Sequence, residues 1–260
     1  MSDQDEQRGL AYVSAGTSAV SNAGLPLEEA VHSSVREELL GAAADPALTA
    51  DLALALLKRP DLPGEVIEAL AKNRALVKLR KVKIALASHP QAPRHVSVPL
   101  IRQFYTFDLM KVALAATVPG DVKRTADEAL EGRLETVTLG ERLTLARQGS
   151  GRIASALLLD SEERIMRAAL ENARLTEALV VRAVVKPAAG SALVQAVAQH
   201  TKWSYRRDVQ VALLRSEYLS LARALAFAPP TRLREILQGS RLPEKTKEQL
   251  LREGKETSSV

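Results

Sequence analysis

The chain has 260 residues, a formal net charge of +5 and no cysteine; 46% of its residues are hydrophobic and only 3% are aromatic. A chain of this length and apolar share folds into a globular protein with a substantial core, which must be built mainly from Ala, Leu and Val. The absence of cysteine excludes disulfides, zinc–thiolate sites, iron–sulfur clusters and cysteine nucleophiles, and it indicates a reducing cytoplasm.

The chain begins with an acidic segment. Residues 1–25 lack apolar periodicity, and we expect them to form a flexible acidic leader. The opening stretch MSDQDEQRGL precedes no secretory h-region, and apolar runs such as LALALL are far shorter than the roughly 20 residues of a membrane span. We therefore expect a soluble, cytoplasmic protein that does not enter a membrane.

Charge is distributed unevenly along the chain. Residues 1–45 carry two basic and eight acidic side chains, whereas residues 74–124 carry ten Lys or Arg against only Asp108 and Asp121. A basic body of this kind attracts an anionic partner or the leader itself, although a general bias for solubility explains the same charges equally well.

A boundary pattern recurs along the chain. In ALLKRPDLPGEV (55–66), ALASHPQAPRHV (85–96) and ALLRSEYLSLA (212–222), an Ala-Leu pair precedes a polar turn, and Pro or Ser stands eight residues after the Ala. Proline at the first helical position loses no hydrogen bond, and Ser or Thr caps free N–H groups. With looser copies included, we expect new helices to open at Thr49, Pro63, Pro93, Pro119, Thr176, Ser220 and Pro243.

The segments between these boundaries are amphipathic. In 75–88, for example, Ala75, Leu79, Val82 and Leu86 share one helical stripe. Spacings of about one helix–turn–helix unit are typical of a solenoid, in which stacked neighbours bury the apolar faces. We predict an all-α, right-handed α-α superhelix (solenoid) of short, irregular helical-hairpin repeats over residues 26–253, followed by a frayed tail at 254–260.

The phrases AL…HPQAP..V, ALLKRPDLP..V and ALENARLT..L resemble HEAT- or armadillo-type repeats, and especially the leucine-rich-repeat-variant type, over roughly residues 45–253. The resemblance implies a right-handed α-solenoid whose usual work is binding. It carries over no catalytic residue.

The basic excess is the main candidate for a site. In a solenoid, equivalent faces of successive repeats line up, so these charges would form a stripe for phosphate backbones or an acidic peptide. The alternative is an ordinary solvated surface. The candidate binding residues are Lys78, Arg80, Lys81, Lys83, Arg94, Arg102, Tyr105, Lys111, Lys123 and Arg124.

Aromatic residues stand beside this excess in RQFYTFDLMK (102–111). Aromatic side chains among basic ones stack on nucleic-acid bases or anchor a partner, but they also fill cores. We expect Phe104 and Phe107, three residues apart, to fill the core and Tyr105 to be exposed.

The only Trp lies in TKWSYRRDVQ (201–210), beside Asp208 and two arginines. HEAT-like alkylpurine DNA glycosylases use Trp, Asp and Arg around an extruded base, but this chain has a single Trp. A helix start is the simpler interpretation, with Ser204 as its cap and Val209, Ala212 and Leu213 packed inside.

Other chemical motifs are weak. The four histidines form no ligand pair at metal-binding spacing, so we predict neither a metal site nor another cofactor. The glycine-rich RQGSGRIAS (147–155) lacks the Lys-Ser/Thr ending of a phosphate-binding loop, and we expect Ser150 to cap a helix there.

These observations favour a non-enzymatic interaction scaffold or adaptor. Its partner would be a protein or peptide, acidic in character, bound on the concave face of the solenoid. The alternative is sequence-independent nucleic-acid binding through residues 74–124, with a HEAT-like DNA glycosylase as a remote third reading. The sequence does not indicate the oligomeric state.

Overall fold

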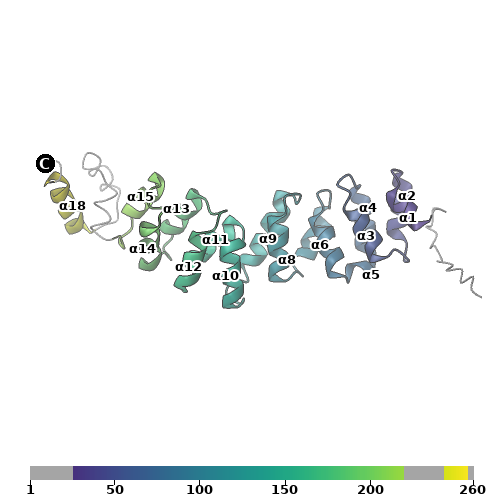
Figure 1. Cartoon of the computed structure of the whole chain (residues 1–260), viewed down its shortest axis with the longest axis horizontal. Helices are drawn as coiled ribbons and strands as arrows, with labels where there is room; N and C mark the ends of the chain where they lie inside the picture. The colour runs from purple at the N-terminus through teal and green to yellow at the C-terminus, as the bar shows by residue number, and fades with distance from the viewer. Residues whose placement is uncertain (1–25, 220–242, 257–260) are drawn as a thin grey trace, which may run out of the picture. The chain divides into compact units, whose positions relative to one another are not determined.

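The computed structural model describes residues 26–219 and 243–256, and every regular element in these ranges is an α-helix (Figure 1). The predicted all-α fold is therefore confirmed. The expected leader, residues 1–25, and the predicted opener Ser220 lie outside the described residues. The described residues form two compact units, which meet in the sequence between Leu100 and Ile101.

The first unit is a stack of short helices in which each packs against a helix further along the chain. Helix α1 packs against α3 and α3 against α6, while α2 packs against α4. The helices are α1 (Leu27–His32), α2 (Arg36–Ala44), α3 (Ala50–Leu57), α4 (Gly64–Lys72), α5 (Arg74–Val77) and α6 (Arg80–Ser88). Helix α7 (Arg94–Ile101) ends at the boundary between the units.

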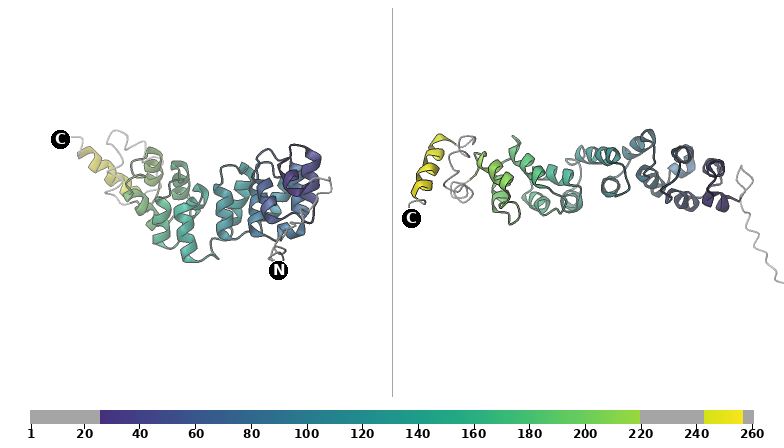
Figure 2. Two further views of the ribbon diagram at one scale, coloured as in Figure 1. Left: turned by 45° about the vertical axis from the view of Figure 1, so that its right-hand side comes forward. Right: turned by 90° about the horizontal axis from the view of Figure 1, so that it is seen from above.

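The second unit repeats this arrangement in two rows of helices. One row contains α9, α11, α13 and α15, and the other contains α10, α12 and α14; successive members of each row pack together (Figure 1). The helices are α8 (Thr106–Leu114), α9 (Gly120–Glu131), α10 (Leu139–Gln148), α11 (Gly151–Leu157), α12 (Glu163–Leu170), α13 (Glu177–Val185), α14 (Ser191–Gln199), α15 (Arg207–Leu214) and α18 (Glu244–Glu256). Further views of the helices are given in Figure 2. Helix α18 extends into the segment 254–260 that was expected to fray.

Helix boundaries recur at a nearly constant interval. The residues that directly precede α4, α7, α9, α11, α13 and α15 are separated by 30, 26, 31, 26 and 30 positions, and they are Pro63, Pro93, Pro119, Ser150, Thr176 and Arg206. This interval, together with the packing of helices on equivalent neighbours within each unit, is compatible with a helical-repeat solenoid. The repeat is more regular than the sequence pattern alone indicated.

The predicted openers mark helix starts, but the prolines stand one residue earlier than expected. Pro63 and Pro119 are N-cap residues with φ of −59° and −55° and extended ψ of 142° and 146°, so the helix proper begins at the following glycine. The carbonyl of Pro63 accepts the first helical bond, from Val66 N at 3.0 Å. Thr49 caps α3 with its side chain, and Thr176 and Pro243 also precede helices.

The predicted continuous helix over 75–88 is wrong. The chain is broken between α5 and α6, and Leu79 adopts an extended conformation as the N-cap of α6. Its side chain is exposed, whereas Val82 and Leu86 are buried. The break resets the helical phase, so the stripe drawn through Ala75 and Leu79 does not continue into α6.

The core is built almost entirely from Leu, Val, Ala and Ile, and the only buried aromatic side chains in the described residues are Phe104 and Trp203. Apolar residues before the helix starts, such as Leu62, Val118 and Leu175, are buried in it. Small side chains allow the closely spaced stacking of short helices. None of the described helices combines the length and hydropathy needed to cross a membrane.

Candidate functional site

The predicted basic residues of the first unit lie on three successive elements. Lys78 is the C-cap of α5. Arg80, Lys81 and Lys83 belong to α6, and Arg94 is the first residue of α7. Lys81 and Lys83 lie on opposite flanks of the buried Val82, with Arg80 between them on the outer side. The charges of α6 therefore surround its exposed half instead of forming a narrow line.

The remaining predicted residues belong to the second unit. Arg102 and Tyr105 lie in the segment before α8, Lys111 is in α8, and Lys123 and Arg124 are in α9. Lys123 Nζ donates a hydrogen bond to Ala116 O at 3.5 Å. The structure thus describes the ten candidates as two sets, one in each unit.

The aromatic segment is partly as predicted. Phe104 is buried and Tyr105 is 72% exposed, as expected, but Phe107 is 36% exposed and the prediction of a core position for it is wrong. Phe104 precedes α8 and packs in the core, whereas Phe107 lies near the start of α8, on the side away from the buried Leu109 and Val112. The i, i+3 spacing misled because the helix begins between the two residues.

The polar turn residues of the recurring boundary pattern connect neighbouring repeats. His89, at the end of α6, accepts a hydrogen bond at Nδ1 from Gln91 N, at 3.1 Å, so Nε2 carries the hydrogen and donates to Arg59 O at 2.7 Å. Asn172, after α12, does the same: its Oδ1 accepts from Arg174 N, and its Nδ2 donates to Ala146 O in the preceding repeat. These side chains join the main chains of neighbouring repeats, which explains their place in the pattern.

In the repeat that contains α15, two side chains, those of His200 and Trp203, form hydrogen bonds to the preceding repeat. His200 Nδ1 accepts from Lys202 N at 3.1 Å, and Nε2 donates to Glu171 Oε1 at 3.1 Å. Trp203 is buried, and its Nε1 donates to Leu170 O at 2.9 Å. Its indole therefore belongs to the core between repeats, with Lys202 Nζ lying 4.1 Å from the ring centroid.

The expected cap before α15 is wrong, although its packing is as predicted. Arg206 occupies the N-cap position, and Ser204 is buried in the preceding turn. Val209, Ala212 and Leu213 are buried, as expected. At α11 the predicted cap is confirmed, because Ser150 Oγ accepts a hydrogen bond from Ile153 N at 3.3 Å.

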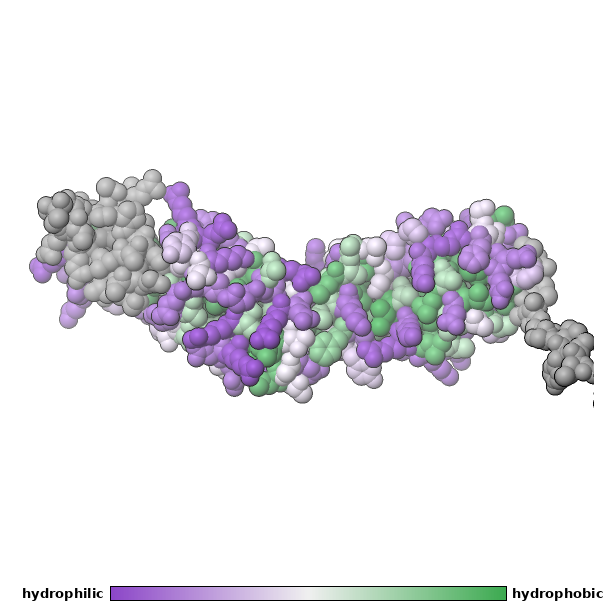
Figure 3. Space-filling view, in the orientation of Figure 1, coloured by the Kyte–Doolittle hydropathy of each residue, from purple (hydrophilic) through white to green (hydrophobic). Residues whose placement is uncertain are grey.

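A groove with three arginines crosses the row formed by α10, α12 and α14. It has a volume of about 540 Å³, and we call it the arginine groove. Its lining residues are Arg147, Arg164, Arg167, Ala168, Leu170, Glu171, Ala196, Gln199 and His200. On the face shown in Figure 3, hydrophilic side chains predominate over α10 and α12, with smaller hydrophobic patches among them.

One outward stripe of α12 forms the centre of the groove. Arg164, Arg167, Ala168 and Glu171 follow the spacing i, i+3, i+4, i+7, which places them on one side of the helix. Ile165, Met166, Ala169 and Leu170 are buried on the other side. The helix is thus held by its apolar face and presents two arginines outward on a floor of small side chains.

The arginines of the groove differ in their partners. Arg167 Nε donates to Glu163 Oε1 at 2.9 Å, one turn earlier in α12. Arg147 and Arg164 are exposed, and neither forms an ion pair with another described residue. A guanidinium presents a planar fork of donors that matches a carboxylate or phosphate, so two such groups beside one groove suit an anionic ligand.

Sequence reasoning missed the arginine groove. The stripe of α12 was visible in the sequence as a helical spacing of Arg, Arg, Ala and Glu opposite an apolar face. Arg147 lies 17 positions before Arg164 and on another helix, so only the packing of α10 on α12 brings them together. The excess of charge at 74–124 was the stronger signal in composition.

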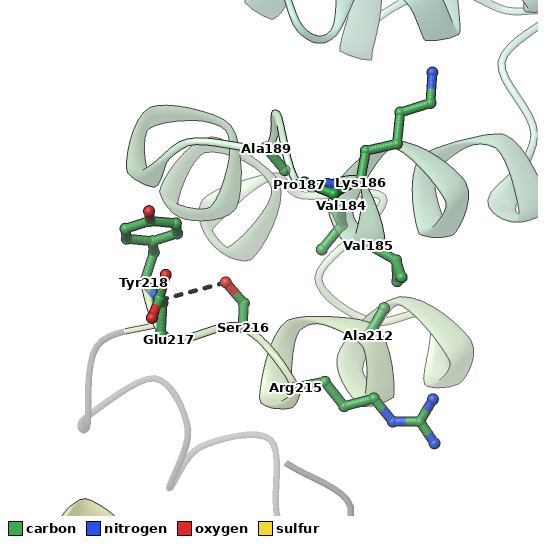
Figure 4. A pocket seen from close by; sticks show the side chains of 10 residues that line it. All are labelled: Val184, Val185, Lys186, Pro187, Ala189, Ala212, Arg215, Ser216, Glu217 and Tyr218. Carbon is green, nitrogen blue, oxygen red and sulfur yellow. Dashed lines mark hydrogen bonds between the residues drawn. The ribbon is translucent and has the colours of Figure 1, made fainter. Parts of the chain in front are cut away.

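A second pocket, of about 400 Å³, lies at the ends of α13 and α15 (Figure 4). Val184 and Val185 come from α13, and Ala212 from α15. In the loop that follows, Ser216 Oγ accepts a hydrogen bond from Tyr218 N at 3.3 Å. Its lining combines apolar and polar residues. The last of them, Tyr218, stands one residue before the end of the first described range.

Within the described ranges, no group of three or more His, Cys, Asp or Glu side chains is placed to hold a metal ion. Comparison with family models, with curated proteins and with solved structures found no match to this chain.

Proposed function

We propose that this chain is a non-enzymatic interaction scaffold, built as a right-handed solenoid of HEAT/armadillo type, that binds an acidic segment of a protein partner in the arginine groove. The observation that carries the proposal is the pair of exposed arginines, Arg147 and Arg164, which lie on neighbouring helices of one row and form no ion pair with another described residue. Ala168 of α12 and Ala196 of α14 also line the groove, and their small side chains allow a peptide backbone to approach the helices closely.

The groove suits a peptide better than a small molecule. It is bordered by three helices and lined by long polar side chains at its rim and by small apolar ones elsewhere. Acidic side chains of a partner would pair with Arg147, Arg164 and Arg167, while its apolar atoms would cover Ala168 and Ala196. Charged rims of this kind steer association and orient the ligand.

The proposal is tested with a fluorescent glutamate-rich peptide titrated into the full chain. Arg147→Glu with Arg164→Glu should weaken binding by at least about tenfold, equivalent to 1.4 kcal/mol, because two attractions become repulsions. Arg182→Glu with Arg207→Glu is the matched control, since it changes the same charge on exposed residues of α13 and α15. Equal binding by both variants would rule out the arginine groove as the site.

Sequence-independent nucleic-acid binding is the second candidate, favoured by the basic residues that cover the exposed half of α6. Reversing Lys78, Arg80, Lys81 and Lys83 to Glu should then abolish retention of a single-stranded oligonucleotide, and wild-type affinity should fall steeply with salt. The alternative result is that neither protein binds the oligonucleotide and that the glutamate-rich peptide binds the variant as tightly as the wild type. This result would favour peptide binding in the arginine groove over nucleic-acid binding.

A further inference from the structure

The first unit carries a groove of similar size whose charges are opposite. It has a volume of about 550 Å³ and lies between α2 and α4, with Leu40 and Ala44 on the α2 side. An outward stripe of α4 contributes Glu65, Glu68, Ala69 and Lys72. Val66, Ile67 and Leu70 face the core, so this stripe, like that of α12, is the exposed side of a helix anchored in the stack.

The two stripes have the same spacing and complementary residues. The α4 stripe reads Glu, Glu, Ala, Lys at positions i, i+3, i+4 and i+7, and the α12 stripe reads Arg, Arg, Ala, Glu at the same positions. With the helices side by side and parallel, Glu65 meets Arg164, Glu68 meets Arg167, and Lys72 meets Glu171. In the antiparallel direction Glu65 would meet Glu171 and Lys72 would meet Arg164, so the charges select one orientation.

The centre of each stripe permits close approach. Ala69 and Ala168 occupy the same position in the two stripes, between the charged residues. The axes of packed helices lie about 8–10 Å apart, and they lie closer when the side chains at the contact are small. Each stripe also lies beside a groove that can accept the side chains of the other stripe. The contact therefore combines a small apolar centre with a charged rim.

The ion pairs that these residues now make are on the surface and exchange readily. Glu65 pairs with Arg36, Glu68 Oε1 lies 3.3 Å from His95 Nε2, and Arg167 pairs with Glu163. Arg36, Glu65 and Arg167 are all more than half exposed in their side chains. Exposed pairs contribute little to stability, so replacing them with pairs across an interface is not opposed by a large loss.

We propose that the acidic segment bound in the arginine groove is the α4 stripe of a second copy of this chain. This inference rests on the proposed function and names its partner. The two contacting surfaces differ, so the association is head-to-tail: each copy offers its α4 to one neighbour and its α12 to another. Such association continues beyond a dimer unless the rotation closes a ring.

The test uses two variants of the full chain, each with one surface reversed. Arg164→Glu with Arg167→Glu removes the α12 surface and keeps α4, while Glu65→Arg with Glu68→Arg removes the α4 surface and keeps α12. Sedimentation velocity is measured from micromolar to sub-millimolar concentration at low salt. The wild type should grow in mass with concentration, and each variant alone should remain a monomer.

Mixing the two variants should restore growth in mass with concentration, because the α4 surface of each variant is complementary in charge to the α12 surface of the other. The variant with all four changes should associate again, since both surfaces are reversed together. Arg182→Glu with Arg207→Glu should associate as the wild type does. Circular dichroism checks folding, and Arg164→Gln with Arg167→Gln replaces the first variant if helicity is lost.

A wild type that stays monomeric throughout, or a mixture of the two variants that stays monomeric, overturns the inference. The proposed function fails separately, when the glutamate-rich peptide binds the wild type and the Arg147→Glu, Arg164→Glu variant equally. A monomeric wild type that binds the peptide through the arginine groove would keep the proposed function and assign its partner to another protein.

Discussion

Side chains at the ends of helices tie each repeat to the main chain of the one before it. Asn172 is 1% exposed, and its Nδ2 donates to Ala146 O at 2.8 Å and to Gly149 O at 3.2 Å. Asn73 donates in the same way to Asp45 O, but at 3.4 Å and in a half-buried position. A buried carbonyl without a partner is unfavourable, so these amides hold the spacing between repeats.

The first prediction compares these two positions. Asn172→Ala should lower the free energy of unfolding by about 2–4 kcal/mol, because it leaves two buried carbonyls and one N–H without partners. Asn73→Ala should lower it by only about 1 kcal/mol, since its bonds are longer and nearer to water. Urea unfolding followed by circular dichroism measures both values. Losses of equal size would show that burial does not determine the contribution of the tie.

Asp127 is one of the few buried acidic residues among those that the structure describes. It lies in α9, and its Oδ1 accepts a hydrogen bond from Ser150 Oγ, the cap of α11, at 2.7 Å. Burial raises the pKa of its carboxyl above the ordinary value of 3.8, and this effect exceeds the opposing one of the Ser150 hydrogen bond. The ionised form is therefore less stable in the folded chain than in the unfolded one.

The second prediction follows from the sign of this shift. A raised pKa in the folded state means that Asp127 opposes folding at neutral pH and that this opposition disappears as the pH falls below the ordinary value. Asp127→Asn, which still accepts from Ser150, should stabilise the chain at pH 7 by about 0.5–1 kcal/mol. Thermal unfolding should show the gain shrinking at acidic pH. A gain that grows on acidification would contradict the assigned cause.

At the scale of single residues, the sequence predicts local contacts such as helix caps but not contacts between residues far apart in the chain. Ser150 was expected to cap a helix because serine precedes a glycine and an apolar run, and local spacing decides such contacts. The hydrogen bond from Ser150 to Asp127 spans 23 positions and depends on α9 packing against α11. The exposure of Phe107 likewise depends on where α8 begins, which spacing alone did not reveal.

At the scale of elements, a glycine follows the opening residue of three helices, with different surroundings. A Cβ atom at Gly151, the first residue of α11, would lie 2.4 Å from Arg174 O in the next turn. At Gly64 the nearest atom would be Gln91 O at 3.4 Å, which is ordinary contact, and at Gly120 nothing lies within 4 Å. Glycine is therefore required at α11 by the closeness of the neighbouring repeat.

The third prediction uses this contrast. Gly151→Ala should destabilise the chain by about 1–3 kcal/mol, because the added methyl group forces the main chain around Arg174 to move. Gly120→Ala should be neutral or stabilising by up to about 1 kcal/mol, since alanine restricts the unfolded chain and meets no obstacle. The midpoints of urea unfolding decide. Equal effects at both positions would mean that the close approach at Gly151 is unimportant.

The starts of helices were predictable because proline, serine and threonine act locally. Their ends and breaks were less so: α5 and α6 are separate because Leu79 adopts an extended conformation, although the sequence of 75–88 favours a continuous helix. Asn73 Oδ1 accepts from Ala75 N and so starts α5 after α4 without a loop. A one-turn helix of this kind depends on its cap and on the packing of both neighbours.

At the scale of the molecule, the repeat is a unit that can be removed. Ser150 and Thr176 stand at equivalent places, and the 26 residues after Ser150 contain α11 and α12. Without them, Ser150 would precede α13, and α9 and α10 would meet α13 and α14 as they now meet α11 and α12. Stability in such arrays is the sum of repeats and of contacts between neighbours.

The fourth prediction is that deleting residues 151–176 leaves a folded, less stable chain with unchanged helicity per residue. Deleting 151–163, which removes one helix and leaves α12 without its partner in the other row, should abolish cooperative unfolding of this unit. Circular dichroism and thermal unfolding distinguish the two. Loss of structure in both deletion variants alike would argue against a modular repeat. The variant that lacks residues 151–176 should also fail to bind the glutamate-rich peptide, because α12 is absent from it.

The ties between repeats have one more consequence. Asn172, His89 and Trp203 all donate to carbonyl oxygens of the main chain, a group that every amino acid supplies. A substitution at the residue that supplies the carbonyl oxygen leaves this oxygen in place. Only the donating side chain must therefore be retained for one repeat to stay aligned on the next. Sequences of this architecture are thus free to diverge widely over evolutionary time while the alignment of one repeat on the next is inherited.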